Sequence, residues 1–402
     1  MSCAVTLAEV SVSITGGVKP CCMAKGSYKA DNNFFETYKT SLLSMWFSES
    51  RRKWIEDMRN GIKVPACRSC WVEEENNIRS VRSSLNEQYS SYDLKFEDLP
   101  KKIDLHIGNT CNLKCRSCNA SQSSAYLQED AQLNSPSDIT GYIKNYYKKS
   151  PGISKNFNFD NDYLWEDIFK ILHSVETIQF QGGEPFFTPK HRSIIDYCIE
   201  HDLAKNIELF YSTNGTIFPE EYIESLKQFK NVTISFSIDG VGKRFEYLRH
   251  PACWTDVVDN IQKFIAVNKF KFRITLTMTV FNIYYIHEVV DFVQRHFNFN
   301  VQINIARASY NPSLLNIEVK NKVIDHLLNQ SCFDNKRWHV VRDALIKYLK
   351  GTMNDSNFEE WTKIYNDTMR RDKFRKENFE ETFPEYYEIL KDHIPQKELI
   401  YG

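Results

Sequence analysis

Between residues 98 and 310, short β-type segments alternate with helical patterns, and this alternation constrains the fold more than any other feature of the sequence. Alternating strands and helices are typical of a parallel sheet of class α/β. The six predicted strands are Lys102–Gly108, Thr177–Gln181, Asn206–Ser212, Val232–Ile238, Phe272–Val280 and Val301–Ala306. Six units, rather than eight, predict a partial (β/α)6 barrel.

The predicted strands alternate apolar and polar residues. In the fourth, Val232, Ile234 and Phe236 share one face, whereas Thr233 and Ser235 share the other. Because successive side chains of a strand point to opposite faces, one face of the sheet is expected to be polar. Helices should cover the apolar face, so the polar face should line a wet, concave, TIM-like half-barrel. The alternative is an antiparallel sheet with its polar face in water, but the intervening helices argue against it.

Composition excludes some classes of protein. The net charge is −1, so no basic excess suggests binding to nucleic acid. The first ten residues, MSCAVTLAEV, show no basic leader, and no segment approaches the ~18 apolar residues of a membrane helix. We therefore expect a cytoplasmic protein without a membrane anchor. Flanking the barrel, we expect a cysteine-rich domain at 1–97 and a helical extension at 311–402.

Eight of the 11 cysteines fall in two dense groups, and only Cys198, Cys253 and Cys332 stand alone. An odd number of cysteines in a cytosolic chain points to metal ligation rather than to disulfides. The first group follows the first predicted strand directly, with Cys111, Cys115 and Cys118 in the spacing C-x3-C-x2-C.

Three thiolates in this spacing can hold three irons of a [4Fe–4S] cubane and leave the fourth iron open to a cofactor or substrate. A zinc site is the alternative, and it would need a fourth ligand such as His106.

This cysteine motif at the end of a strand resembles the signature of the radical S-adenosylmethionine (SAM) superfamily. The resemblance implies that the cluster on Cys111, Cys115 and Cys118 binds SAM and cleaves it reductively. The resulting 5′-deoxyadenosyl radical would abstract hydrogen from a substrate. The motif Gly182-Gly183-Glu184-Pro185, directly after the second strand, is similar to the family's GGEP turn, which implies contact with the cofactor's amino group.

Other strand ends also resemble cofactor contacts of that family. Ser212 and Asn214 end the third strand, Ser237 and Asp239 end the fourth, and Arg249 occupies a position that implies contact with the methionine carboxylate. A surface ion pair is the alternative for Arg249. All of these motifs fall at the carboxyl ends of strands, where parallel α/β folds bind ligands.

The sequence departs from the family in one respect. Ser117 stands where relatives often carry an aromatic residue against adenine, so Leu113 or the third strand would have to hold that ring.

The second cysteine group comprises Cys3, Cys21, Cys22, Cys67 and Cys70. Its order, a Gly-Gly turn, then Pro-Cys-Cys, then C-x2-C-Trp, resembles the auxiliary-cluster half-domain called twitch, which is related to SPASM. The resemblance implies a second [4Fe–4S] cluster, placed before the barrel rather than after it. We expect Cys3, Cys21, Cys67 and Cys70 as ligands, with Cys22 able to replace Cys21 or Cys3. A zinc site is the alternative.

Together these features predict a radical SAM enzyme that abstracts hydrogen from a polar small molecule or a peptide. A flavodoxin or ferredoxin would supply electrons, and the second cluster would assist oxidation or electron transfer. Two alternatives stay open. One is a non-catalytic iron–sulfur or zinc protein, and the other is a nucleic-acid-modifying member of the same superfamily with a basic rim at the barrel mouth.

Four isolated features complete the expectations. Cys198 should lie in the core of its helix, and Cys253 should be a small buried residue rather than a hydrogen-atom donor. His106 and Asp104 should face the barrel interior. The long insertion at 126–162 is expected to form a lid.

Overall fold

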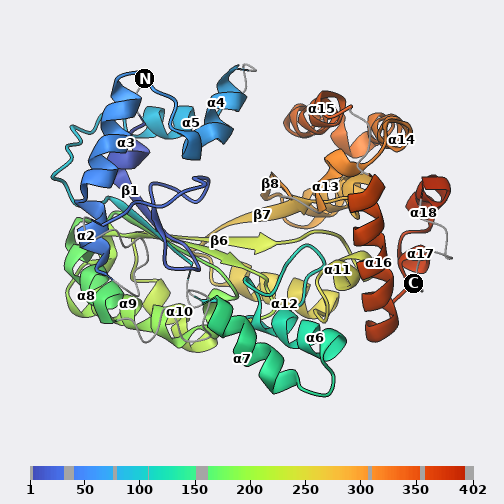
Figure 1. Ribbon diagram of the computed structural model, residues 1–402, viewed down its shortest axis with the longest axis horizontal. Helices are drawn as coiled ribbons and strands as arrows, with labels where there is room; N and C mark the ends of the chain where they lie inside the picture. The colour runs from blue at the N-terminus through green and yellow to red at the C-terminus, as the bar shows by residue number, and fades with distance from the viewer. Residues whose placement is uncertain are drawn as a thin grey trace.

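The computed structural model describes residues 3–30, 40–75, 79–106, 108–150, 162–306, 310–353 and 358–393. One open sheet runs through the described molecule in the order β2-β1-β3-β4-β5-β6-β7-β8 (Figure 1). The strands are β1 (Glu9–Val12), β2 (Val18–Lys19), β3 (Lys102–His106), β4 (Thr177–Gln181), β5 (Glu208–Thr213), β6 (Asn231–Ser237), β7 (Lys271–Met278) and β8 (Asn300–Ile305).

Strands β3 to β8 are the six strands predicted from the sequence. Each pairs parallel with the next, so the parallel prediction is confirmed and the antiparallel alternative is wrong. The sheet does not close, because β2 and β8 are its two edges. The result is the partial barrel that six units predict.

The sequence did not predict β1 or β2. Strand β1 pairs parallel with β3, Val10 lying opposite Ile103, and β2 pairs antiparallel with β1. Strand β1 does alternate, with Glu9 and Ser11 on one face and Val10 and Val12 on the other, although all four residues are buried. Its four residues are the shortest run that a period-2 pattern can assign to a strand, so the signal was missed. The predicted boundary near residue 97 stays a prediction, although β1 adds an N-terminal strand to the core sheet.

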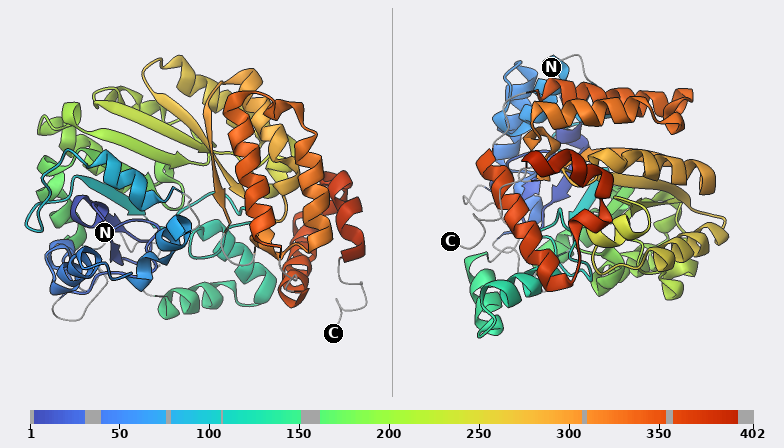
Figure 2. Two further views of the ribbon diagram at one scale, coloured as in Figure 1. Left: turned by 90° about the horizontal axis from the view of Figure 1, so that it is seen from above. Right: turned by 90° about the vertical axis from the view of Figure 1, so that its right-hand side faces the viewer.

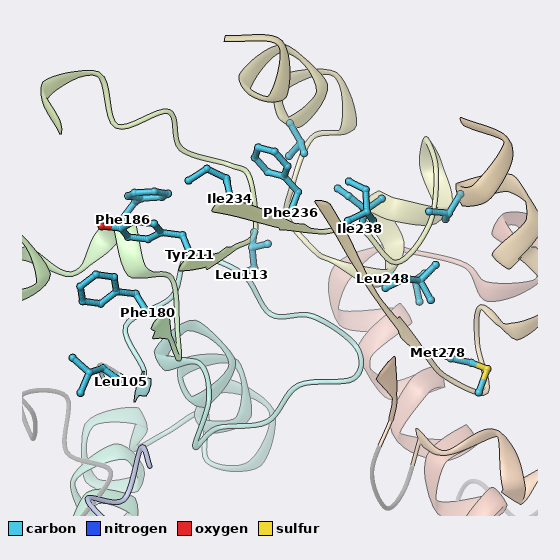
Figure 3. Close-up of a cluster of buried hydrophobic side chains, with 14 of the residues drawn as sticks. Leu105, Leu113, Phe180, Phe186, Tyr211, Ile234, Phe236, Ile238, Leu248 and Met278 are labelled. Atoms are coloured by element: carbon cyan, nitrogen blue, oxygen red, sulfur yellow. The ribbon is translucent and has the colours of Figure 1, made fainter. Parts of the chain in front are cut away.

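One face of the sheet is apolar and buried. Ile178, Phe180, Leu209, Ile234 and Phe236 are each 3% exposed or less, and several of these side chains are seen in Figure 3. Helices cover this face in Figure 1, among them α8 (Asp162–Ile171), α9 (Pro189–Glu200), α10 (Ile223–Leu226), α12 (Trp254–Ala266) and α13 (Ile286–His296). Burial of these side chains is the main hydrophobic contribution that holds strands and helices together.

The opposite face of the sheet is polar and only half buried at most positions. Gln179, Ser212, Ser237 and Thr275 are partly accessible, whereas the residues directly before and after each of them are buried. The curved sheet turns this face toward the N-terminal segment and the helices that follow the core (Figure 2). The alternation read from the sequence therefore matches the observed faces.

The N-terminal segment packs around a buried cation. The Arg51 side chain donates to the carbonyls of Thr6, Trp46 and Phe96, and its guanidinium lies 3.5 Å from the Trp46 ring centroid. These contacts join α1 (Val5–Ala8), α2 (Leu42–Trp46) and α3 (Glu49–Arg59) to the chain that enters β3. The helices α4 (Arg68–Glu75) and α5 (Val81–Gln88) complete the segment.

The insertion after β3 contains the helices α6 (Ser124–Asn134) and α7 (Ile139–Lys149), which pack against each other. Residues 151–161 of the predicted lid lie outside the described residues. The role of this insertion as a lid stays a prediction.

The predicted C-terminal helices are observed, and they pack onto the core rather than standing apart. They are α14 (Ile317–Leu328), α15 (Lys336–Gly351), α16 (Phe358–Arg375), α17 (Phe379–Thr382) and α18 (Pro384–Leu390). Phe333, Phe383 and Tyr386 are fully buried in the same hydrophobic cluster as the sheet. None of the helices in the described ranges is both long enough and apolar enough to cross a lipid bilayer.

Candidate functional site

The cysteine loop, residues 108–124, leaves the carboxyl end of β3 and is fixed by hydrogen bonds on both sides. At its two ends, the Ser124 amide donates to the Asn109 carbonyl over 2.7 Å. In its middle, the amides of Lys114 and Arg116 donate to the carbonyls of His250 and Leu248, over 2.7 and 2.8 Å. These residues follow or end helix α11 (Lys243–Leu248). The three thiols thus sit on a loop held between β3 and α11.

Leu113 is buried within this loop. Figure 3 shows it beside Tyr211 and Ile234 of the sheet, and it is 2% exposed. This side chain therefore anchors the loop to the core. Its suggested contact with adenine stays a prediction, as does a contact from β5.

The glycine turn after β4 lies directly against the cysteine loop. The Glu184 amide donates to the Thr110 carbonyl over 2.8 Å. Gly183 has φ of +51°, and a Cβ placed on it would lie 2.2 Å from the Thr110 carbonyl oxygen. Only glycine allows the backbone at position 183 to come this close to the Thr110 carbonyl. The structure thus brings together two motifs that are about 70 residues apart in the sequence.

The carboxylate of Glu184 is fully buried and bonds to other parts of the chain. Its oxygens accept hydrogen bonds from the Thr213 hydroxyl (2.8 Å) and from the amides of Asn214 (2.7 Å) and Phe186 (3.2 Å). Burial raises the pKa of Glu184 to about 7, because removal from water outweighs these three donors. The predicted contact of Glu184 with a cofactor stays a prediction. Pro185, also buried, starts the short helix that follows.

Asn214, at the end of β5, reaches the cysteine loop. Its Nδ2 donates to Asn112 Oδ1 over 2.9 Å and lies 4.0 Å from the Cys111 sulfur. An amide N–H beside a thiolate is a favourable neighbour for an iron–sulfur ligand. Ser212 and Ser237 lie at the same edge of the sheet and are half-buried.

Arg249 also reaches the cysteine loop, from the end of α11. Its guanidinium pairs with Asp239 over 2.8 Å, and its Nη1 lies 4.0 Å from the Cys115 sulfur. Asp239 also accepts the Thr277 amide over 2.7 Å. The arginine is therefore buried rather than on the surface, and its ion pair with Asp239 holds it in place. The predicted cofactor contacts of Asp239 and Arg249 stay predictions.

This set of groups fits an iron–sulfur cluster, because such clusters are held by thiolates and stabilised by nearby hydrogen-bond donors. The cysteine loop offers three thiols, and the Asn214 amide and the Arg249 guanidinium lie beside two of them. Cys111, Cys115 and Cys118 are all free thiols. Over the described ranges, no three side chains of His, Cys, Asp or Glu gather around a point that a single metal ion could occupy. Burial raises the pKa of Cys111 to about 12, so ligation would displace its proton.

The N-terminal cysteines surround a small cavity. Cys3, Cys21, Cys67 and Cys70 line it together with Met23, Val81 and Arg82. Cys22 is exposed and is absent from its lining. The four expected ligands therefore converge, whereas their role as ligands stays a prediction.

The N-terminal cavity belongs to a hydrophobic cluster separate from the main core. Cys3, Val5, Met58, Val64 and Trp71 form this cluster, with Cys21 and Cys67 packed on it. Burial and the neighbouring Cys67 raise the pKa of Cys3 to about 12. Four thiols that line one small cavity in apolar surroundings suit the ligand set of a cubane, whereas no three of them gather around a point that a single zinc ion could occupy.

The isolated cysteines Cys198 and Cys253 differ in burial. Cys198 is fully buried in α9, as expected. Cys253 is exposed at the start of α12, with its sulfur 3.1 Å from the Thr255 hydroxyl, so the expectation of a buried residue is wrong. The N-cap position of this cysteine keeps it at the helix end rather than on the packed face.

Asp104 and His106 lie on the polar face, as expected. The Asp104 carboxylate accepts hydrogen bonds from Ser11 (3.0 Å) and Gln181 (2.7 Å), and His106 Nε2 is 3.6 Å from it. Burial opposes ionisation of Asp104, but His106 and Gln181 hold its pKa below the ordinary value. The network joins β1, β3 and β4 beneath the cysteine loop.

The sequence analysis missed a group of charged residues that contacts the cysteine loop from α6 and α16. Arg116 lies inside the cysteine motif itself and pairs with Asp372 and Glu377. The partners lie more than 250 residues away, so only the position of an arginine between two cysteines could have signalled this contact.

Comparisons with known proteins cover most of the chain. A model of the radical SAM superfamily matches residues 105–295, and a model of the SPASM iron–sulfur cluster-binding domain matches residues 3–71. The uncharacterized protein MJ0907 of Methanocaldococcus jannaschii is 23% identical over 233 residues, which cover 56% of this chain and 71% of that protein.

Two groups of solved structures are similar at low identity. The structure titled native anSMEcpe with bound AdoMet and Cp18Cys peptide is 19% identical, with a TM-score of 0.38, over 67% of this chain and 64% of that one. Streptococcus suis SuiB bound to S-adenosylmethionine is 15% identical, with a TM-score of 0.35, over 61% of this chain and 47% of that one. The chain thus spans less than two thirds of either.

Proposed function

We propose that this chain abstracts hydrogen from a polar substrate. The premise is that it belongs to the radical SAM superfamily and carries a SPASM-type iron–sulfur domain before its core. The family brings a [4Fe–4S] cluster, SAM and an auxiliary cluster. The proposal assigns the first cluster to Cys111, Cys115 and Cys118, and the auxiliary cluster to Cys3, Cys21, Cys67 and Cys70.

When bound, the first cluster supplies one electron that splits SAM into methionine and a 5′-deoxyadenosyl radical, which takes a hydrogen atom from the substrate. The electron comes from a flavodoxin or ferredoxin. The chain's own residues bind and orient the reactants. An open iron position requires that three, not four, thiolates hold the cluster, and the cysteine loop offers three.

Arg249 is the residue that we assign to the carboxylate of SAM. Its pairing with Asp239 fixes the guanidinium near Cys115 (4.0 Å from Nη1 to the sulfur), and its buried Nε has no hydrogen-bond partner among the described residues. A buried N–H without a partner is costly, and a bound carboxylate would relieve that cost. Because the Glu184 carboxylate already accepts three hydrogen bonds, we assign the contact with the amino group of SAM to the Gly182–Glu184 backbone as well as to this carboxylate.

The substrate would lie against the polar face of the sheet. Gln179, Ser212, Ser237 and Thr275 offer neutral hydrogen-bonding groups there. Such a surface suits a sugar, a nucleotide or a peptide backbone equally well, so both a small molecule and a peptide remain proposals. The auxiliary cluster would accept an electron from the substrate radical or conduct it.

The observation that carries this proposal is the contact of the GGEP turn with the cysteine loop, through the hydrogen bond from Glu184 to Thr110. Neither motif alone points to a SAM site, but their contact at the edge of a parallel sheet supports one. A non-catalytic iron–sulfur protein would have no need of a SAM-binding turn packed on its cluster loop.

The first experiment tests the cleavage of SAM. Anaerobically reconstituted protein, given dithionite and SAM, should form 5′-deoxyadenosine and methionine, measured by mass spectrometry. Cys115→Ala should abolish the product, because the cluster would lose a ligand. Cys332→Ala, a change at a lone cysteine far along the chain, should retain it. Native protein that binds iron yet forms no 5′-deoxyadenosine would contradict the proposal and favour the non-catalytic alternative.

A further inference from the structure

The last turn of α16 contacts the backbone of the cysteine loop, although this helix lies outside the segments that the family models match. Arg375, the final residue of α16, has a fully buried side chain. Its Nη2 donates to the Lys114 carbonyl over 2.8 Å. That carbonyl belongs to the peptide group that leads directly into Cys115, so a C-terminal guanidinium lies next to a predicted cluster ligand.

The loop's own arginine makes a second connection to the C-terminal helices. Arg116 is 2% exposed and pairs with Asp372 and Glu377, while its guanidinium lies 4.1 Å from the Tyr247 ring centroid. The Tyr247 hydroxyl donates to the same Asp372 over 2.8 Å. His250 donates to Glu377 over 2.6 Å. The cysteine loop, α11 and the end of α16 are thus joined by one charged network.

The network continues through Glu129 of α6, which is fully buried. Glu129 accepts hydrogen bonds from Arg375 and Arg371, the closest of each at 2.7 Å, and Lys114 Nζ lies 3.3 Å from it. Although burial opposes ionisation, Arg375 and Arg371 lower the pKa of Glu129 to about 2. The carboxylate is therefore charged, and the arginines around it are fixed in place.

Buried charges are expensive, and replacing them with apolar residues is often neutral or stabilising. Stability alone therefore does not explain why the chain buries a charged network of this size. Within it, Arg375 Nη1 has no hydrogen-bond partner among the described residues. Arg249, which follows α11, and Arg375, which ends α16, place two positive charges around Cys115.

We propose that Arg375 is a positioning residue of the catalytic centre, which fixes the peptide before Cys115 and supplies a buried positive charge beside the cluster. This inference rests on the proposed function only in assuming that Cys115 ligates iron. A reduced cluster carries one more negative charge than an oxidised one, so a nearby buried cation stabilises the reduced state more. The C-terminal helix would thereby raise the reduction potential of the first cluster.

The test compares three variants of the full-length, reconstituted protein. Arg375→Gln removes the charge, Arg375→Lys keeps it, and Arg370→Gln alters an exposed arginine of the same helix that bonds Asn134 at the surface. The midpoint potential of the first cluster is measured by redox titration followed by electron paramagnetic resonance. We expect a more negative midpoint for Arg375→Gln, a midpoint close to native for Arg375→Lys, and no shift for Arg370→Gln.

A second readout covers the case in which Arg375→Gln does not retain its iron. Hydrogen exchange of residues 111–124 in the iron-free protein should be faster in Arg375→Gln than in native protein, and close to native in Arg370→Gln. Unchanged exchange in an iron-poor variant, or an unchanged midpoint in an iron-loaded one, would overturn the inference. Formation of 5′-deoxyadenosine by native protein is scored separately, so failure of the proposed function remains distinguishable.

Discussion

Glu184 shows how the fold modifies a single carboxyl group. Burial raises its pKa to about 7, well above the value near 4.3 of an exposed glutamate. The folded state therefore holds this proton more tightly than the unfolded state does. The resulting stabilisation is complete below pH ~4.3 and is lost as the pH rises through 7, because the buried group must then ionise.

Glu184→Gln should remove this pH dependence. From pH 5 to pH 8, we expect native protein to lose up to about 3 kcal/mol of unfolding free energy relative to the variant. If glutamine forms weaker hydrogen bonds at this site, the unfolding free energy of the variant falls by the same amount at every pH. Urea unfolding of iron-free protein at both pH values measures the difference, with Glu200→Gln at an exposed position of α9 as the control. A constant difference would mean that Glu184 is ionised throughout.

At the scale of elements, the turn between β4 and α9 decides whether the GGEP motif contacts the cysteine loop. Gly183→Ala should separate them, since the new Cβ would overlap the Thr110 carbonyl oxygen at 2.2 Å and the backbone has a positive φ. We expect a loss of at least about 2 kcal/mol of unfolding free energy from strain and the lost contact. Iron retention by the first cluster should fall as well.

Gly351→Ala is the matched control for this turn. Gly351 ends α15, and a Cβ there would meet no atom within 4 Å. Alanine should leave stability unchanged or raise it by about 0.5 kcal/mol. Chemical unfolding and iron analysis of both variants check the prediction, and equal behaviour of the two would show that the turn does not need glycine.

The elements differ in how well the sequence predicted them. Strands β3 to β8 were predictable because they place most of their apolar side chains on one face, as Val232, Ile234 and Phe236 do. Strand β1 was missed although Glu9 and Ser11 alternate with Val10 and Val12, because its four residues are the shortest run that such a pattern can assign to a strand. The motifs at the strand ends were found by local spacing, and the contact between Gly183 and Thr110 follows from their places on neighbouring parallel strands.

Contacts over long sequence separations could not be predicted in the same way. Arg375 and Lys114 are 261 residues apart, and a buried ion network has no periodic pattern to reveal it. The exposure of Cys253 was also missed, because burial of a lone cysteine depends on which side of a helix end it occupies.

At the scale of the whole molecule, the two cysteine sites belong to separate hydrophobic clusters. The first lies at the end of β3 against the main core, whereas the N-terminal cavity lies in the cluster around Trp71. In Figure 2 the N-terminal segment and the C-terminal helices flank the concave side of the sheet from opposite ends. The separation implies that each site can be emptied without unfolding the other.

The double change Cys67→Ala and Cys70→Ala tests this independence. Iron per chain should fall to about half, because one of two four-iron clusters is lost. Formation of 5′-deoxyadenosine from SAM should persist, since the loop of Cys111, Cys115 and Cys118 stays anchored to β3 and α11 by contacts that the N-terminal segment does not make. Cys115→Ala should lose the other half of the iron together with all of this product. Full iron content in the double variant would mean that the N-terminal thiols hold no iron, and loss of both clusters would mean that the two sites fold as one.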